Sequence, residues 1–398
     1  MTTESAPEAA LDGATGWLIV AIGVCLLTVV WGTVFTFTVY AGELARTFGL
    51  SPVRVASVFS ITTALFLVAG GSFGVFAARL PLRPVVATAG VAIGVAVGLL
   101  QVVSTYLGVV AAFGLLGAAS GTTVIVVVAL VPQWFDAYKG LATGIALIGN
   151  GVGVLVLPFV WVWLFARTDV RGAFLVVGGA MVAFVLLASL VYRRPPGRTR
   201  PDTTVDVTWL RRTFTDGRFL GAVSGFALLW TWYFVLSSQL VDMLTTFGID
   251  ATVASTAFGT IGGVSVLSRV GSGAVADRVG MRRTFLTGVS LAAIGVLVLL
   301  DGGSSVRIYA SLVLFGVGLG AVASLYSPII IERFGPENAT AIVGLFNAVE
   351  AVSAFCAPLA ASALVGLTGG YALLLVSLSG VTFLGAGLFY WGTDPTAE

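Results

Sequence analysis

The sequence predicts an all-α membrane protein with twelve transmembrane helices in two pseudo-symmetric six-helix bundles. Hydrophobic residues make up 58% of the 398 residues and charged residues only 10%, which is far too apolar for a soluble globular protein. The apolar residues gather in twelve runs of the length that crosses a bilayer, about 20 residues each. A glycine- and arginine-containing loop also recurs at equivalent places in the two halves of the chain.

The chain opens with a polar segment, 1–16, which carries Glu4, Glu8 and Asp12 but neither Lys nor Arg. A secretory signal would need a basic start and a small-residue cleavage site, so we expect the first apolar run to stay in the protein as a helix. The six runs of the first half are Trp17 to Tyr40, Val55 to Ala78, Val85 to Val103, Tyr106 to Val131, Leu141 to Ala166 and Ala173 to Tyr192.

The polar stretch 193–218 follows the sixth run and holds seven arginines. We interpret it as a solvated cytoplasmic linker beside anionic lipid, joining a bundle at 17–192 to a second at 219–390. A short tail, 391–398, ends the chain. The six runs of the second half are Phe219 to Leu244, Val253 to Ala276, Phe285 to Leu300, Tyr309 to Ile331, Ala339 to Val365 and Tyr371 to Tyr390.

The placement of Lys and Arg predicts the orientation. An even number of helices puts both termini on one side, and a cytoplasmic N-terminus places fourteen basic residues in inner loops against five in outer loops. The positive-inside rule therefore favours cytoplasmic termini in a multi-pass protein of the plasma (inner) membrane.

Several kinds of function are excluded by composition. The two cysteines, Cys25 and Cys356, fall inside apolar runs, where we expect packing residues rather than a disulfide or a metal site. The chain has no His, no phosphate-binding glycine loop and no cluster of metal ligands, so we expect neither an enzyme nor a bound cofactor. We likewise expect no nucleic-acid partner. Because His is absent, a carboxylate has to carry any proton that is transported near neutral pH.

The recurring loop reads GVFAARLPLRP in the first half and GAVADRVGMRR in the second, 199 residues later. Its second copy, GxxxDRxGxRR from Gly273 to Arg283, resembles the signature loop of the major facilitator superfamily, which implies two halves that rock about a central site. The first copy departs from that pattern at Ala78, Pro81 and Pro84. We expect a conformational latch on the cytoplasmic side, with simple topogenic charge as the alternative. The latch candidates are Gly273, Asp277, Arg278, Gly280, Arg282, Arg283, Arg79 and Arg83.

A second motif narrows the resemblance. The segment Trp134 to Gly153, WFDAYKGLATGIALIGNGVG, is similar to the start of helix five in the monocarboxylate transporters and the related oxalate/formate antiporters. Those families show paired basic residues where this chain has only Lys139. Small residues at this spacing also let helices approach closely, which is the structural explanation of the glycines.

One cation, Arg269, lies inside the eighth apolar run. A buried cation costs about 2.5 to 3.5 kcal/mol on insertion scales, so it normally faces a polar cavity or partner. The resemblance implies that Arg269 binds the substrate carboxylate, although Ser265 replaces an acidic residue found in the animal carriers. In helix eleven, Glu350 stands where the oxalate exchangers carry a lysine, and this reversal of charge argues against a dicarboxylate held by two cations.

Arg269 and Glu350 lie about 12 and 18 Å from the cytoplasmic face by helical rise, so an Arg–Glu pair is compatible with the sequence. Glu350 would compete for Arg269 when it is ionised and release it when it is protonated, so that anion and proton load together. Asn347 and Ser353 would make the same helix face polar. The alternative is a permanent ion bridge between the two helices.

Aromatic and polar residues on helices one, seven and ten complete the predicted cavity, and packing or an interfacial belt is the alternative for each. With Arg269, the substrate-binding candidates are Trp31, Phe35, Tyr40, Trp230, Tyr233, Gln239 and Tyr326, and Thr38 lies among them on helix one; the proton-coupling candidates are Glu350 and Asn347.

The sequence thus predicts a proton-coupled secondary transporter of a small, monocarboxylate-like organic anion that works by alternating access as a monomer. Two other functions remain open. One is a facilitator-type efflux pump for apolar or cationic compounds, which would use Glu350 as a cation site. The other is a non-transporting membrane sensor, although none of the polar stretches is long enough for a soluble output domain.

Overall fold

The computed structural model describes residues 11–76, 81–195, 213–301, 304–335 and 339–394. Arg79, most of the predicted linker (196–212), and the ends of both predicted tails (1–10 and 395–398) lie outside these ranges. Within the described ranges the chain is helical and contains no strand, and twelve helical segments are long and apolar enough to cross a membrane. The predicted fold class is confirmed.

The predicted runs are helices with slightly different bounds. The first half contains α1 (Ala14–Phe35), α2 (Phe37–Phe48), α3 (Pro52–Phe76), α4 (Leu82–Val102), α5 (Tyr106–Leu130), the 3-10 turn η1 (Val131–Trp134), α6 (Lys139–Phe165) and α7 (Val170–Val191). The second half contains α9 (Gly217–Leu229), α10 (Thr231–Thr246), α11 (Ala251–Val279), α12 (Met281–Val298), the 3-10 turn η2 (Leu299–Asp301), α13 (Ser305–Phe334), α14 (Ala339–Thr368) and α15 (Ala372–Thr393).

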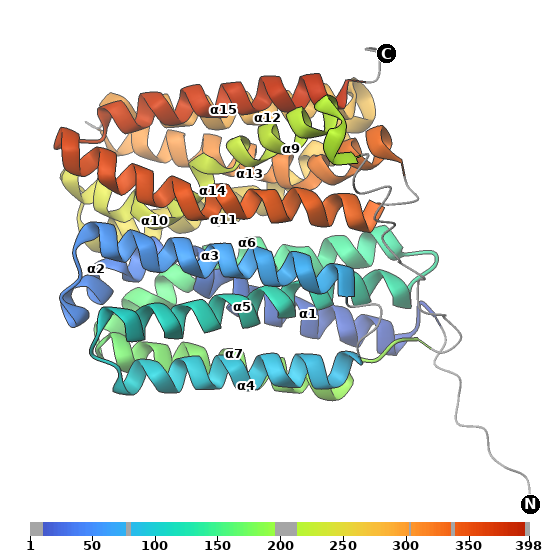
Figure 1. Cartoon of the computed structure of the whole chain (residues 1–398), viewed down its shortest axis with the longest axis horizontal. Coiled ribbons are helices and arrows are strands. Elements are labelled where there is room, and N and C mark those ends of the chain that lie inside the picture. The colour runs from blue at the N-terminus through green and yellow to red at the C-terminus, as the bar shows by residue number, and fades with distance from the viewer. Residues whose placement is uncertain (1–10, 77–80, 196–212, 302–303, 336–338, 395–398) are drawn as a thin grey trace, which may run out of the picture.

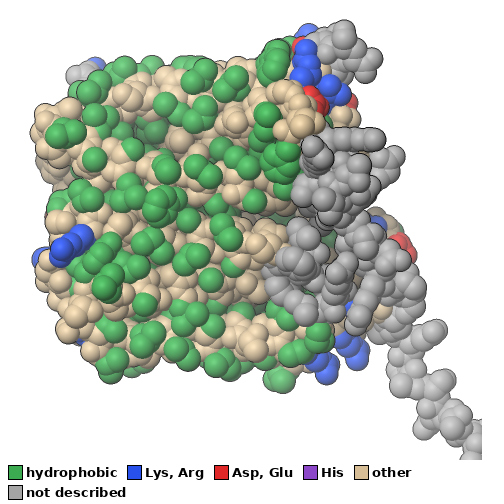
Figure 2. All heavy atoms as spheres, viewed as in Figure 1, with side chains coloured by type: hydrophobic (Ala, Val, Ile, Leu, Met, Phe, Trp, Pro, Cys, Tyr) green, Lys and Arg blue, Asp and Glu red, His purple; other side chains and the backbone are tan. Residues whose placement is uncertain are grey.

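The helices run lengthwise along the molecule, with the first half of the chain on one side and the second half on the other (Figure 1). Helix α1 begins and helix α15 ends at the same end, which we call the terminal end; the other is the distal end. Hydrophobic side chains cover the middle of the face shown in Figure 2, whereas charged side chains lie near its two ends. This distribution suits a body that is surrounded by lipid between two polar surfaces.

The two halves share local irregularities, as expected of repeats. The first spanning segment is interrupted at Thr36, between α1 and α2, and the seventh at Trp230, between α9 and α10. Helices α6 and α14 contain Pro158 and Pro358 at equivalent places, 200 residues apart. Proline removes one backbone donor, which a helix tolerates in a membrane when neighbouring groups satisfy the freed carbonyl.

Glycines let the helices pack at backbone distance. A Cβ on Gly121 of α5 would lie 1.9 Å from the carbonyl oxygen of Phe66 on α3, and one on Gly117 would lie 2.2 Å from that of Thr62. No real side chain fits such a distance, so these positions need glycine. Close packing of this kind is how membrane helices associate without a hydrophobic driving force between them.

The halves meet along three pairs of helices: α3 with α14, α6 with α11, and α2 with α10. On the distal side, the Val241 amide of α10 donates a hydrogen bond to Thr38 Oγ1 of α2 at 2.8 Å, and near the middle of the helices Thr63 Oγ1 of α3 donates to the Ala354 carbonyl of α14 at 3.3 Å. The first of these bonds closes the distal end between the halves. The cavity that remains lies nearer to the terminal end.

Candidate functional site

A cavity of about 210 Å³ lies between the two halves. The described residues that line it number twenty-six, fourteen from the first half and twelve from the second. It reaches toward the terminal end at least as far as Val343, four residues from the start of α14, or about 6 Å along the helix. A concave, mostly apolar space with a few convergent polar groups is the usual form of a small-molecule site.

Arg269 supplies the positive charge of the cavity. It lies on α11, which begins where the Asp250 carboxylate accepts hydrogen bonds from the amides of Thr252 and Val253. The Nε atom of Arg269 is buried and has no hydrogen-bond partner, and among the described residues none forms an ion pair with its guanidinium. A buried charge without a partner is costly unless a ligand or water supplies one.

Glu350 supplies the negative charge of the cavity from α14, where its side chain is 8% exposed. Within the described part of the chain, no Arg nitrogen lies within 4.0 Å of its carboxylate, so Arg269 and Glu350 do not form an ion bridge in this structure. Tyr233 and Tyr326 line the same cavity as both charged groups. The helical rise gives the depths of Arg269 and Glu350 in the membrane but not the distance between their side chains. Helix α13 packs beside α11 and contributes Tyr326 to the same cavity.

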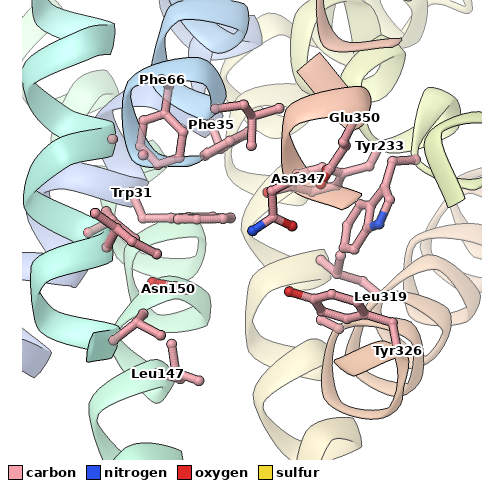
Figure 3. Close-up of a pocket in the computed structure, with 18 of the residues that line it drawn as sticks. Trp31, Phe35, Phe66, Leu147, Asn150, Tyr233, Leu319, Tyr326, Asn347 and Glu350 are labelled. Atoms are coloured by element: carbon pink, nitrogen blue, oxygen red, sulfur yellow. The ribbon is translucent and has the colours of Figure 1, made fainter. Parts of the chain in front are cut away.

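Asn347 lies one turn before Glu350 and also lines the cavity. Figure 3 shows its amide pointing into the space between the halves, opposite Trp31 and next to the hydroxyl end of Tyr326. Ser353, three residues beyond Glu350, is buried on the same helix but does not line the cavity. The predicted polar face of α14 is therefore polar toward the cavity at two of its three positions.

The first half contributes an aromatic wall. Trp31 and Phe35 are stacked with ring centroids 4.4 Å apart, and Phe66 of α3 meets each of them edge-on at 5.5 Å. The wall continues into the second half, because the ring of Tyr233 lies 5.5 Å from that of Phe35. Trp230 lines the same cavity, and its buried Nε1 atom has no hydrogen-bond partner.

Asn150 of α6 is a cavity residue that sequence analysis missed. It is 5% exposed, and its Oδ1 atom is buried without a hydrogen-bond partner. The next residue, Gly151, packs against Ser265 of α11, and Asn150 lines the same cavity as Arg269. The repeat contained a signal for it: Asn150 precedes Pro158 by eight residues, as Glu350 precedes Pro358.

Two predicted substrate-binding residues lie outside the cavity. Tyr40 is completely buried in the core of the first half, where its ring packs on Trp161 at 5.0 Å and its hydroxyl donates to the Thr33 carbonyl at 2.8 Å. Gln239 lies toward the distal end and donates to the Pro358 carbonyl at 3.2 Å. Thr38 joins α2 to α10, as described above. The break at Thr36 separates the environments of Tyr40 and Thr38 from that of Trp31 and Phe35.

The described latch candidates lie at the terminal end. Gly280 has a φ of +96° and connects α11 to α12, a conformation that favours glycine. Arg282 lies 3.6 Å from the Asp394 carboxylate at the end of α15. Asp277 is exposed and has no ion-pair partner within the described ranges. Arg278, Arg283 and Arg83 are also exposed, and Gly273 has open space around it.

The chain is similar in sequence to a known family throughout its length. A family model described as Major Facilitator Superfamily matches residues 20–358 and 221–398. Monocarboxylate transporter 13 of Rattus norvegicus is 27% identical over 387 residues, covering 95% of this chain and 89% of that protein. Monocarboxylate transporter 2 of Homo sapiens is 24% identical over 403 residues, covering 93% and 84%.

Solved structures share the fold. A bacterial homologue of the human lysosomal transporter Spinster, in an inward-facing and unoccupied conformation, superposes with a TM-score of 0.76 at 13% identity, covering 96% of this chain and 97% of that one. At this identity the likeness concerns the arrangement of the helices alone.

Proposed function

We propose that this chain, which belongs to the Major Facilitator Superfamily and is a membrane transporter, moves a small organic monoanion together with a proton. The observation that carries the proposal is the Arg269 guanidinium, which faces the cavity between the halves without an ion-pair partner among the described residues. A guanidinium presents a fork of donors that matches a carboxylate, and a bound carboxylate would remove the cost of the buried charge.

The charges of the cavity support a cargo with one carboxylate. Of the described residues that line it, Arg269 is the cation and Glu350 the acid. A second carboxylate on the cargo would face Glu350 without a cation to balance it, so a dicarboxylate is disfavoured. The similarity to proteins named monocarboxylate transporters points in the same direction.

Glu350 is the group that we propose for proton coupling. While Glu350 is ionised and Arg269 is empty, the two opposite charges of the cavity balance each other. Binding of an anion neutralises Arg269, and protonation of Glu350 then removes the remaining negative charge. A cavity loaded in this way is neutral, which lowers the cost of moving the halves past the membrane centre.

Uptake by proteoliposomes tests the function. Purified protein should accumulate labelled small monocarboxylates when the acceptor side is alkaline, and uptake should collapse when the pH gradient is dissipated. A monocarboxylate panel that neither enters nor competes would contradict the proposal. Accumulation of organic cations in place of anions would support an efflux pump that uses Glu350 as a cation site.

Glu350→Gln separates coupling from binding. The amide is neutral at every pH and retains hydrogen-bonding capacity, so anion exchange should continue while its dependence on the pH gradient disappears. Counterflow and gradient-driven uptake are compared in the same vesicles, with Glu332→Gln at the exposed terminal end of α13 as the matched control. Gradient-driven uptake by Glu350→Gln at the wild-type rate would remove Glu350 from the mechanism.

We further propose that both termini and the 193–218 linker are cytoplasmic, that the protein resides in the plasma (inner) membrane, and that one chain is the working unit. The basic residues at the terminal end support this orientation. The Arg282–Asp394 contact joins the signature loop to the end of α15. Both belong to the second half, so the contact is compatible with a loop that moves together with this half as one rigid body.

A further inference from the structure

The aromatic wall of the first half is a built surface. Trp31 stacks on Phe35, and Phe66 braces both rings from α3 with edge-on contacts at interplanar angles of 82° and 86°. Phe35 and Phe66 are almost completely buried, at 1% and 4% exposed, whereas Trp31 is partly exposed. Figure 3 shows Trp31 reaching into the space between the halves. The wall therefore presents one ring that two buried rings hold in place.

Aromatic residues are concentrated around this cavity. Eight of the twenty-six lining residues are Phe, Trp or Tyr, about three in ten, whereas aromatic residues are 11% of the chain. Lipid-facing packing does not explain the difference, because these rings point inward from both halves. Rings that face an open space are suited to stacked or edge-on contact with another ring.

The aromatic wall and the guanidinium belong to different halves but lie close together. Tyr233 connects them: its ring centroid is 5.5 Å from that of Phe35, and it lines the same cavity as Arg269. A molecule whose carboxylate binds Arg269 therefore lies in the cavity that the wall of Trp31 also lines. A two- or three-carbon acid would leave much of the 210 Å³ to water, since about 10 to 15 Å³ of such cavity volume holds one water molecule.

We propose that the cargo is a monocarboxylate that carries an aromatic ring, with its carboxylate on Arg269 and its ring on the wall formed by Trp31, Phe35 and Phe66. This assignment rests on the proposed function and names its substrate class. Such a cargo contacts both halves at once, with its charge on the second half and its ring on the first. An acid without a ring contacts the second half through its carboxylate but makes few contacts with the aromatic wall of the first half.

Four matched compounds test the assignment as competitors for the uptake of a labelled small monocarboxylate: phenylacetate, cyclohexylacetate, propionate and 2-phenylethylamine. Phenylacetate should compete best, about three- to tenfold better than cyclohexylacetate, because the two acids differ chiefly in aromaticity. Propionate should be weaker than both, and the amine should not compete because Arg269 repels it. Propionate as the best competitor would overturn the ring assignment and leave the anion carrier intact, whereas competition by the amine alone would overturn both.

Trp31→Leu locates the ring contact. The variant should lose the preference for phenylacetate over cyclohexylacetate. Trp163→Leu, at a side chain that is 54% exposed on the outside of α6, is the matched control. Thermal unfolding of both variants reports folding, and Phe66→Leu gives a second test if Trp31→Leu is unstable. A retained preference in folded Trp31→Leu and Phe66→Leu would overturn the proposal.

Discussion

At the scale of single residues, Asn150 is the polar side chain that the first half contributes to the cavity. It lines this cavity together with Arg269. Its Oδ1 atom is buried and unsatisfied, and a buried polar group of this kind costs about 1 to 3 kcal/mol until a partner arrives. The terminal amide can donate to a bound carboxylate or accept from a donor on the cargo. We therefore expect Asn150 to bind the cargo together with Arg269.

Asn150→Asp tests this position. A carboxylate there would add a second negative charge to the cavity and oppose the binding of an anion, so the KM for anion uptake should rise tenfold or more, about 1.4 kcal/mol. Asn150→Ser should have a much smaller effect, because it removes the amide without adding charge. KM values for the two variants measured in parallel check the prediction. Equal effects of Asp and Ser would contradict it.

The sequence predicted Arg269 and Glu350 because a charge inside an apolar run is conspicuous. It could not distinguish Tyr40 from Phe35, although the two lie five residues apart on the same run. The break at Thr36 turns α2 relative to α1, which places Tyr40 in the core of the first half while Phe35 stays at the cavity. An asparagine among glycines carries no such conspicuous charge, which is why Asn150 was missed.

At the scale of the elements, the break in the first spanning segment coincides with a contact to another helix. Thr36 Oγ1 donates to the Gly32 carbonyl at 2.7 Å and accepts from Trp161 Nε1 of α6 at 3.0 Å. The twelve runs predicted the spanning segments to within a few residues, since length and hydropathy decide them. Neither Thr36 nor Trp230 is a proline or glycine, so local sequence does not signal these breaks.

Gly121→Ala tests the close contact between α5 and α3. The added Cβ would collide with the Phe66 carbonyl, so the helices must separate at a cost of about 1 to 3 kcal/mol or more. The variant should unfold at a lower temperature than the wild type in detergent. Gly179→Ala on α7, where a Cβ meets no atom within 4 Å, is the matched control and should be neutral. Equal stability of the two variants would rule out the contact as described.

At the scale of the whole molecule, the two halves divide the work of binding. The second half holds the charged groups, Arg269 and Glu350, and the first half holds the aromatic wall and Asn150. The distal end is closed by the Thr38–Val241 hydrogen bond, and the cavity extends from there toward the terminal end. Cargo that contacts both halves favours their approach, which is what alternating access requires of a substrate.

The measurement that tests the central claim most directly is gradient-driven uptake by Arg269→Gln. Arg54→Gln, exposed on the other side of the molecule, is the matched control, and thermal unfolding verifies that both variants are folded. Removal of one partner of a buried charge pair costs about 2 to 5 kcal/mol, so uptake by Arg269→Gln should fall thirtyfold or more while Arg54→Gln keeps the wild-type rate. Wild-type uptake by folded Arg269→Gln would contradict the anion site and the transport mechanism that depends on it.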